Sequence, residues 1–183
     1  MGDCIIIDGK AVSAALKERL ATTVSGMDKK PGLAVILVGD DPASHVYVRN
    51  KIKACEKVGI RSFEARLPEK ATQAEIAAEI KAFNNNESVD GILLQLPVPK
   101  HLDSDALIQM IDPRKDVDGL TLPNIGALVA GLPGLVPCTP QGSLLLIKEV
   151  EQDLSGKHAV VIGRSLLFGK PMAQLLLQEN CTV

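Results

Sequence analysis

Three polar side chains that can hold or transfer a proton follow one another at helical spacing. Ser44, Tyr47 and Lys51 occupy positions i, i+3 and i+7, which lie one above another on a single helix face. Tyr47 is the only tyrosine of a chain in which 2% of the residues are aromatic. A phenol one turn from an ammonium favours proton transfer, although the same spacing also occurs by chance on solvated helix faces.

The residues before this trio predict how it is positioned. Residues 33–39 are a short run of mostly branched apolar side chains that ends in glycine, which is typical of a buried strand. Asp41 is then predicted to cap a helix, with Pro42 at the first helical position, where a missing N–H costs nothing. The polar trio would therefore lie near the carboxyl end of a strand, where open α/β sheets bind their ligands.

Predicted strands and helices alternate over the first part of the chain. The predicted strands are residues 33–39, 60–67 and 90–97, with a brief strand and turn at residues 5–10. The predicted helices are residues 11–24, a helix from Pro42 to a C-cap at Gly59, residues 72–83, and a helix that starts at Asp103 or Ser104 and ends before Asp112. This order predicts a parallel α/β sheet.

The composition of the sequence changes in residues 116–140, which contain four prolines and four glycines. Such a segment indicates a domain boundary or a crossover that lines a cleft. The elements predicted beyond it are a helix capped by Thr139 that runs from Pro140 to about Glu151, a buried strand at residues 157–163, a helix at residues 172–178, and the start of a strand at residues 181–183.

A glycine-bounded turn joins the last predicted strand to its helix. Gly163, Arg164, Ser165 and Gly169 could form a phosphate-binding turn, because backbone N–H groups and the helix dipole attract an anion there. The spacing departs from G-x-G-x-x-G, so an ordinary strand-to-helix turn is an equal alternative. Arg164 could contact a nucleotide phosphate, including the 2′-phosphate of NADP, or be a surface residue.

Two further positions carry polar groups at predicted strand ends or turns. Gln95 precedes Leu96 and Pro97, where its amide could orient a lysine or a ligand, or satisfy loop backbone groups instead. Asp116 and Asp118 lie just before Gly119. A carboxylate there can hold a paired N–H edge of a heterocycle through two hydrogen bonds, whereas shaping a turn is the commoner use of Asp-Gly.

The composition excludes several classes of function. The chain has 183 residues and a formal net charge of −2 without a basic block, so nucleic-acid binding is not expected. No apolar run approaches the roughly 18–20 residues that span a bilayer, and the first residues are no secretory signal. Cys4, Cys55, Cys138 and Cys181 show neither zinc nor disulfide spacing. We therefore expect a reduced, cytoplasmic, soluble protein without a metal site.

Taken together, the motifs resemble the bifunctional methylenetetrahydrofolate dehydrogenase / methenyltetrahydrofolate cyclohydrolase family. Five blocks carry the resemblance, and they occur in the same order over nearly the whole chain. The blocks are residues 38–44 with 47–51, residues 90–97, residues 115–119, residues 137–140, and residues 163–165 with 169–172. No single block would be specific for this family, whereas the ordered set of five is highly specific for it.

The resemblance implies an α/β folate-binding domain at residues 1–122, followed by a linker helix and the first unit of a Rossmann-like NAD(P)-binding domain at residues 123–183. It also implies a homodimer that oxidises 5,10-methylenetetrahydrofolate with NADP, or with NAD, and hydrolyses the methenyl product to 10-formyltetrahydrofolate.

The resemblance also implies roles for individual residues. Lys51 would transfer the proton in hydrolysis, and Tyr47 would stack on the folate. Gln95 would position Lys51, Asp118 would hold the pterin ring, and Ser44 would be a polar neighbour. In the cofactor domain, Gly163, Arg164, Ser165 and Gly169 would bind the nucleotide.

Two alternatives stand beside this hypothesis. Short-chain dehydrogenases also pair a tyrosine with a lysine four residues later, but their glycine-rich turn precedes the pair, whereas here it follows, so chain order excludes them. The other alternative is a catalytically silent folate- or nucleotide-binding fragment. Because the predicted second domain stops at Val183, we expect a truncated chain in which an open sheet edge impairs the dehydrogenase step.

Overall fold

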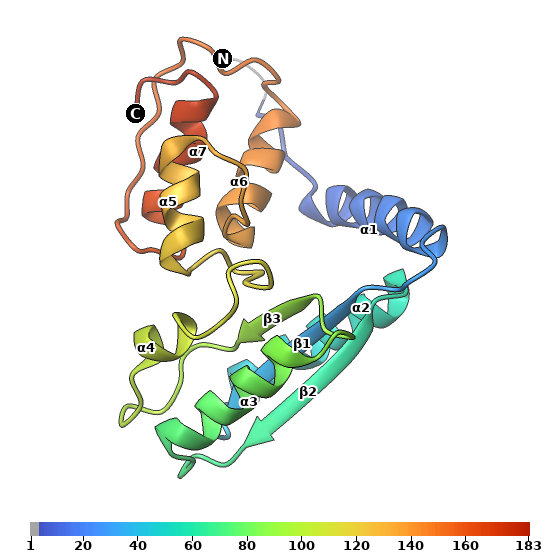
Figure 1. The fold of residues 1–183 in the computed structure, drawn as a ribbon. Coiled ribbons are helices and arrows are strands. Elements are labelled where there is room, and N and C mark those ends of the chain that lie inside the picture. The colour runs from blue at the N-terminus through green and yellow to red at the C-terminus, as the bar shows by residue number, and fades with distance from the viewer. Residues whose placement is uncertain (1–3) are drawn as a thin grey trace.

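The computed structural model describes residues 4–183, which contain a three-stranded parallel sheet (Figure 1). Its strands are β1 (Gly32–Val38), β2 (Arg61–Leu67) and β3 (Gly91–Leu94), and β1 lies in the centre in the order β2-β1-β3. Both neighbours run parallel to β1. The predicted parallel α/β sheet is therefore confirmed, with each of its three main strands within a few residues of its expected position.

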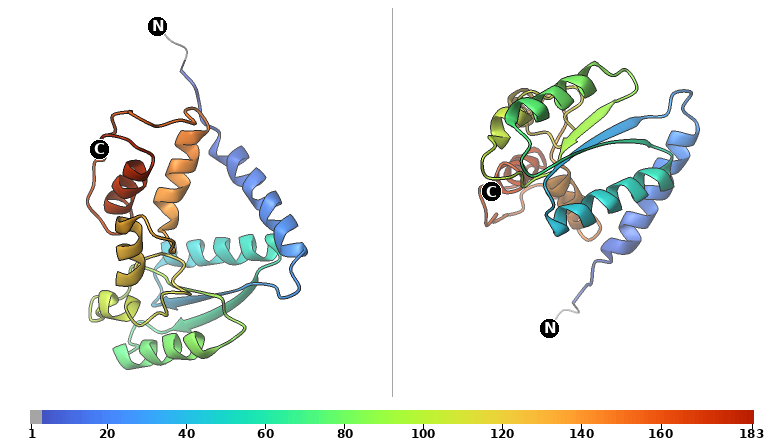
Figure 2. Two further views of the ribbon diagram at one scale, coloured as in Figure 1. Left: turned by 45° about the horizontal axis from the view of Figure 1, so that its top comes forward. Right: turned by 90° about the horizontal axis from the view of Figure 1, so that it is seen from below.

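Two helices cover the sheet on opposite faces (Figure 2). Helix α2 (Pro42–Val58) buries Val48 against Val35 and Leu37 of β1, whereas α3 (Gln73–Asn85) packs on the alternate residues of the same strand. Side chains of a strand point alternately to its two faces, so a central strand covered on both faces is buried throughout. Helix α1 (Gly9–Ser25) packs beside α2.

Local capping signals in the sequence set the ends of α2. The carboxylate of Asp41 accepts a 2.8 Å hydrogen bond from the backbone N–H of Ser44, and Pro42 opens the helix. Gly59 ends it with a φ of 81°, in the left-handed region that favours glycine. Both predicted caps of this helix are confirmed.

The brief strand predicted at residues 5–10 is wrong. Residues 4–8 have no regular structure, and Asp8 instead caps α1, accepting hydrogen bonds from the N–H groups of Lys10 and Ala11 at 2.9 and 3.1 Å. Ile6 is 88% exposed. An apolar triplet forms a strand only where a neighbouring strand can pair with it, and within the described part of the chain none lies beside this segment.

The second part of the chain forms a helical layer over one end of the sheet (Figure 1). After the short α4 (Ser104–Ile108), the chain forms α5 (Leu122–Ala130), α6 (Cys138–Lys148) and α7 (Gly169–Gln178), with both α5 and α6 packed on α7. Helix α5 was not predicted from the sequence. Helix α6 begins at Cys138, before the predicted Thr139 cap, because the Pro137 carbonyl already accepts from the N–H of Gln141 at 3.3 Å.

The buried strand predicted at residues 157–163 is also wrong. One parallel bridge joins His158 to Thr182, and Val160 and Ile162 are 89% and 95% exposed. A strand needs backbone partners along its length, and within residues 4–183 this segment finds them only at the bridge. The strand expected at residues 181–183 is reduced to the same bridge. None of the described helices combines the length and apolar character that crossing a membrane requires.

Candidate active site

A cavity of about 840 Å³ lies beside the carboxyl end of the sheet and reaches the helical layer. Its lining brings together five predicted site residues, which are Ser44, Tyr47, Lys51, Gln95 and Asp118. They come from α2, from the end of β3 and from the turn before α5, segments that are far apart in the sequence. Ligand sites of open α/β sheets occupy this position, beyond the strand ends.

Lys51 and Gln95 are in direct contact within this cavity. The ammonium of Lys51 donates a 3.1 Å hydrogen bond to Oε1 of Gln95. Nε2 of Gln95 donates at 2.7 Å to the carbonyl of Leu96, which leaves its oxygen to face Lys51. The backbone N–H of Gln95 donates at 2.9 Å to the carbonyl of Ile36, so the sheet itself holds this residue in place. The amine is therefore held at a fixed point of the cavity wall.

Asp118 is a partly buried carboxyl group in the same wall. Burial raises its pKa from 3.8 to about 6, because a charged carboxylate is poorly solvated there. The positive charge of Lys51 opposes this rise in pKa, and the negative charge of Asp116 adds to it. At neutral pH the group is mainly ionised and can accept hydrogen bonds, and it gains a proton as the pH falls through about 6.

Ser44 and Tyr47 differ in how free they are to contact a ligand. Ser44 is buried, and its hydroxyl donates a 2.8 Å hydrogen bond to the carboxylate of Asp41, so it completes the helix cap at the edge of the cavity. Tyr47 is 64% exposed. Its ring therefore offers an open aromatic surface at the cavity wall.

The glycine-bounded turn before α7 is tight. A side-chain carbon on Gly169 would lie 2.3 Å from the carbonyl carbon and oxygen of Gly163, which itself has a φ of 147°. The hydroxyl of Ser165 accepts a 3.1 Å hydrogen bond from the N–H of Phe168. Glycine is thus required at position 169 by close backbone contact.

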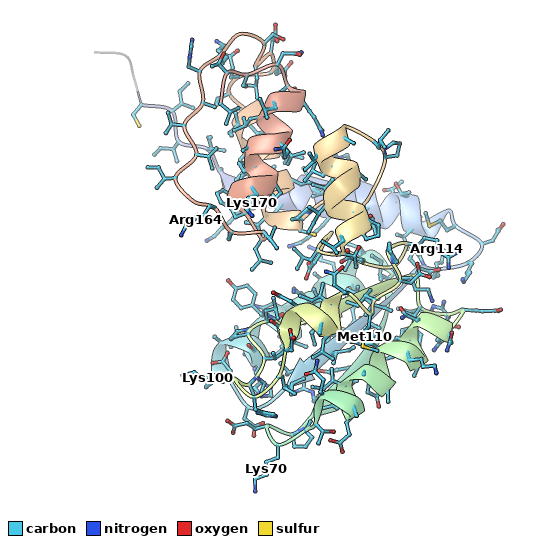
Figure 3. All side chains as sticks on the ribbon, turned by 60° about the vertical axis from the view of Figure 1, so that its left-hand side comes forward. Lys70, Lys100, Met110, Arg114, Arg164 and Lys170 are labelled. Carbon is cyan, nitrogen blue, oxygen red and sulfur yellow. The ribbon has the colours of Figure 1, made fainter. Side chains whose placement is uncertain are left out.

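The polar residues of this turn do not line the cavity, to which only its Leu167 contributes. Arg164 and Ser165 are exposed, and Figure 3 shows Arg164 near Lys170 on the helical layer, at the side toward the sheet. The structure therefore brings the five predicted substrate-side residues together at one cavity, whereas the predicted nucleotide-binding residues lie outside its lining.

Two residues that the sequence analysis did not propose also line the cavity, namely Cys138 and Thr139 at the start of α6. The thiol of Cys138 lies 3.5 Å from the carbonyl of Val117. The block at residues 137–140, one of the five that carry the family resemblance, was the sequence signal that could have identified these two residues as part of the site. Across residues 4–183, no cluster of three or more metal-binding side chains occurs.

Comparison with known proteins gives two family matches. The family model of the tetrahydrofolate dehydrogenase/cyclohydrolase catalytic domain matches residues 7–118, and that of the NAD(P)-binding domain of the same family matches residues 137–183. A similar relative is the "Bifunctional protein FolD" of Sphingopyxis alaskensis, which is 57% identical over 99% of this chain and 61% of its own length. The chain thus spans about three fifths of that relative.

Solved structures agree with this comparison. The bifunctional enzyme FolD of Campylobacter jejuni superposes with a TM-score of 0.94 at 47% identity, covering 98% of this chain and 65% of that one. The FolD of Trypanosoma brucei, solved with NADP cofactor and an inhibitor, gives a TM-score of 0.94 at 35% identity, covering 100% of this chain and 64% of that one. This chain belongs to the tetrahydrofolate dehydrogenase/cyclohydrolase family.

Proposed function

We propose that this chain carries the catalytic site for two steps of one-carbon folate metabolism. The first step oxidises 5,10-methylenetetrahydrofolate with NAD(P)⁺, and the second hydrolyses 5,10-methenyltetrahydrofolate to 10-formyltetrahydrofolate. The observation that carries this proposal is the Lys51–Gln95 hydrogen bond of 3.1 Å in the wall of a cavity that Tyr47 and Asp118 also line. A purely structural lysine would have no need of a partly buried amide partner at a ligand cavity.

Hydrolysis requires a base next to a cationic carbon. Water adds to the cationic methenyl carbon and loses one proton, which gives a neutral carbinol. The carbinol hydroxyl then loses its proton as the bond from that carbon to N5 breaks and N5 gains a proton, so one proton is released overall. Lys51 can take part in these transfers, accepting a proton from oxygen as an amine and giving one to N5 as an ammonium. Gln95 accepts a hydrogen bond from one N–H of Lys51 and so fixes the direction in which the other positions on that nitrogen point.

Asp118 and Tyr47 would bind the pterin ring. An ionised carboxylate at Asp118 can accept two parallel hydrogen bonds from the paired N–H groups of that ring. Its pKa of about 6 means that this binding form prevails at neutral pH and is lost in acid. Tyr47 offers a flat, exposed aromatic face on which the folate can stack. Ser44 contributes indirectly, by completing the cap that starts the helix carrying both Tyr47 and Lys51.

The oxidation step would use a dinucleotide at the second domain. NADP, or alternatively NAD, supplies the hydride acceptor when bound. The residues fit such a group, because Gly163 and Gly169 make a tight turn at the start of α7 and that helix has no side-chain cap. Ser165 belongs to this turn, and the exposed guanidinium of Arg164 can pair with the 2′-phosphate of NADP.

The proposed domain division places residues 1–122 in the folate domain and residues 123–183 in the linker helix and cofactor domain. The family matches at residues 7–118 and 137–183 support it, as does the packing of α5 on α7. A cytoplasmic homodimer remains part of the proposal. The four cysteines, all free thiols, are consistent with a reducing compartment.

A catalytically silent folate-binding fragment is the second candidate. The exposed segment around Val160 and Ile162 favours this candidate. The segment pairs with a neighbour at a single bridge, so the expected strand of the cofactor domain is not formed. Loss of methenyltetrahydrofolate, followed by its absorbance, separates the two candidates. We expect hydrolysis by the wild-type chain and none by Lys51→Met, with Lys53→Met on the exposed side of α2 as the matched control. Hydrolysis that survives Lys51→Met would refute the catalytic proposal.

A further inference from the structure

A buried polar network lies directly behind Asp118. Asp116 is 1% exposed and Asn124 is 6% exposed. The carboxylate of Asp116 accepts hydrogen bonds from the N–H of Thr121 at 2.8 Å and from Nδ2 of Asn124 at 3.0 Å. Burying a carboxylate and an amide is costly unless their polar atoms are paired, so these bonds hold the two residues in one arrangement.

Asp116 begins the turn that carries Asp118. Its carbonyl accepts a 3.1 Å hydrogen bond from the N–H of Gly119, which closes a four-residue turn with Asp118 at the third position. On the other side Asp116 bridges to Ile92 of β3. Asp116 therefore fastens this turn to the edge of the sheet through its backbone and to the start of α5 through its side chain.

Asn124, at the start of α5, joins this turn to two other segments. Its Nδ2 also donates at 2.8 Å to the carbonyl of Pro113, and its Oδ1 accepts at 3.3 Å from the N–H of Leu135. Leu135 lies against the turn, because a side-chain carbon on Gly119 would approach its carbonyl oxygen to 2.6 Å. The amide of Asn124 thus connects the Asp118 turn with the segment that leads into α6 and its cavity-lining Cys138.

We propose that Asn124 is a positioning residue, which acts through Asp116 to hold the carboxylate of Asp118 in the orientation that binds the folate ring. This inference rests on the proposed function, in which Asp118 contacts the substrate and Asn124 does not. The short turn supports it, because Asp118 lies two residues from Asp116 in the turn that Asp116 closes, and the charge of Asp116 adds to the effect of burial in raising the pKa of Asp118. Asn124 belongs to the segment between the two family matches, which cover residues 7–118 and residues 137–183.

A double-mutant cycle on the full chain tests this role. The probe is 5-formyltetrahydrofolate, a stable reduced folate, and its dissociation constant is measured by calorimetry for wild type, Asn124→Ala, Asp118→Asn and the double variant. We expect Asn124→Ala to weaken binding about tenfold in the wild-type background and to have no further effect in the Asp118→Asn background. If Asn124→Ala does not fold, Asn124→Ser takes its place in the same cycle, with the same expectation.

A spectroscopic measurement accompanies the cycle. Carbon-13 NMR of the Asp118 carboxyl should give a pKa of about 6 in the wild type and a lower value in Asn124→Ala, because a loosened turn admits water to the group. Thr121→Val is the matched control. It keeps the N–H that Asp116 uses and removes a buried hydroxyl that, over the described residues, has no hydrogen-bond partner, so affinity and pKa should not change.

The outcomes separate the two proposals. Equal weakening by Asn124→Ala in both backgrounds, or no weakening in either, would overturn the positioning role while leaving the proposed function in place. A wild-type chain that does not bind the folate, or binding that Asp118→Asn leaves intact, would overturn the proposed function and the positioning role together.

Discussion

The ammonium of Lys51 and the amide oxygen of Gln95 lie 3.1 Å apart although the residues are 44 positions apart in the sequence. Helix α2 presents the amine and the end of β3 presents the amide. Because β1 and β3 pair in parallel, the end of β3 lies at the same end of the sheet as the connection from β1 to α2, and Lys51 reaches Gln95 from the middle of that helix.

Replacing Gln95 with Leu should slow hydrolysis of methenyltetrahydrofolate about 100-fold, because the amine loses the partner that aligns it with the substrate. Folate affinity should change much less, since Asp118 and Tyr47 remain. The absorbance assay measures the rate, and calorimetry measures the affinity. Gln152→Leu, at an exposed position in the second part of the chain, is the control. An unchanged rate in Gln95→Leu would contradict the alignment role.

The raised pKa of Asp118 predicts how stability depends on pH. Because the pKa of this carboxyl rises from an ordinary value of 3.8 to about 6 on folding, the folded state holds this proton more tightly than the unfolded state. The contribution of this group to the free energy of unfolding is therefore largest below pH 4 and is lost as the pH rises through about 6. Asp118→Asn should abolish this component. Measured against wild type at the same pH, the variant should therefore be more favourable in stability at pH 7 than at pH 4.

Urea unfolding of wild type and Asp118→Asn at several pH values between about 4 and 8 measures this difference. Asp28→Asn, at an exposed loop position, is the control and should give a nearly constant difference from wild type. If the stability difference between Asp118→Asn and wild type does not vary with pH, the carboxyl does not titrate in this range.

Gly169→Ala should damage the turn before α7, because its new methyl group would lie 2.3 Å from the Gly163 carbonyl. We expect a loss of about 1–3 kcal/mol in the free energy of unfolding and a loss of NADP affinity. Thermal unfolding and NADP titration measure the two effects. Gly142→Ala within α6 is the matched control, because a methyl group there meets no atom within 4 Å. It should stabilise the helix by about 0.5–1 kcal/mol.

Lys115 stabilises the end of α3 and should be costly to replace. Its ammonium donates to the carbonyls of Phe83, Asn84 and Asn86 at 3.1, 2.8 and 3.0 Å. Lys115→Met should lower the free energy of unfolding by about 1–3 kcal/mol, because three carbonyls at a helix end lose a charged donor. Urea unfolding measures the loss. Lys81→Met, exposed on the same helix, should change stability by less than about 0.5 kcal/mol.

Helix α2 and strand β1 show what could be predicted from the sequence. The Asp41 cap, the Pro42 start and the Gly59 end act within a few residues of their own position, so they are visible without knowledge of the fold. The alternation of strands and helices then places Lys51 and Gln95 at the same end of a parallel sheet. The five ordered blocks named the family, which the comparisons confirm.

The tertiary structure decided the features that depend on distant partners. Residues 157–163 have a strand-like composition but pair with a neighbour only at His158, since backbone hydrogen bonding is a property of two segments. The Asn124 network, likewise, joins groups that no spacing rule connects. The sequence by itself determined the boundaries of α2, the parallel sheet and the residue types of the site, because these follow from local capping and periodicity. Only the folded chain decided which of those side chains share a cavity and how burial changes their charge, because contact and desolvation arise from packing.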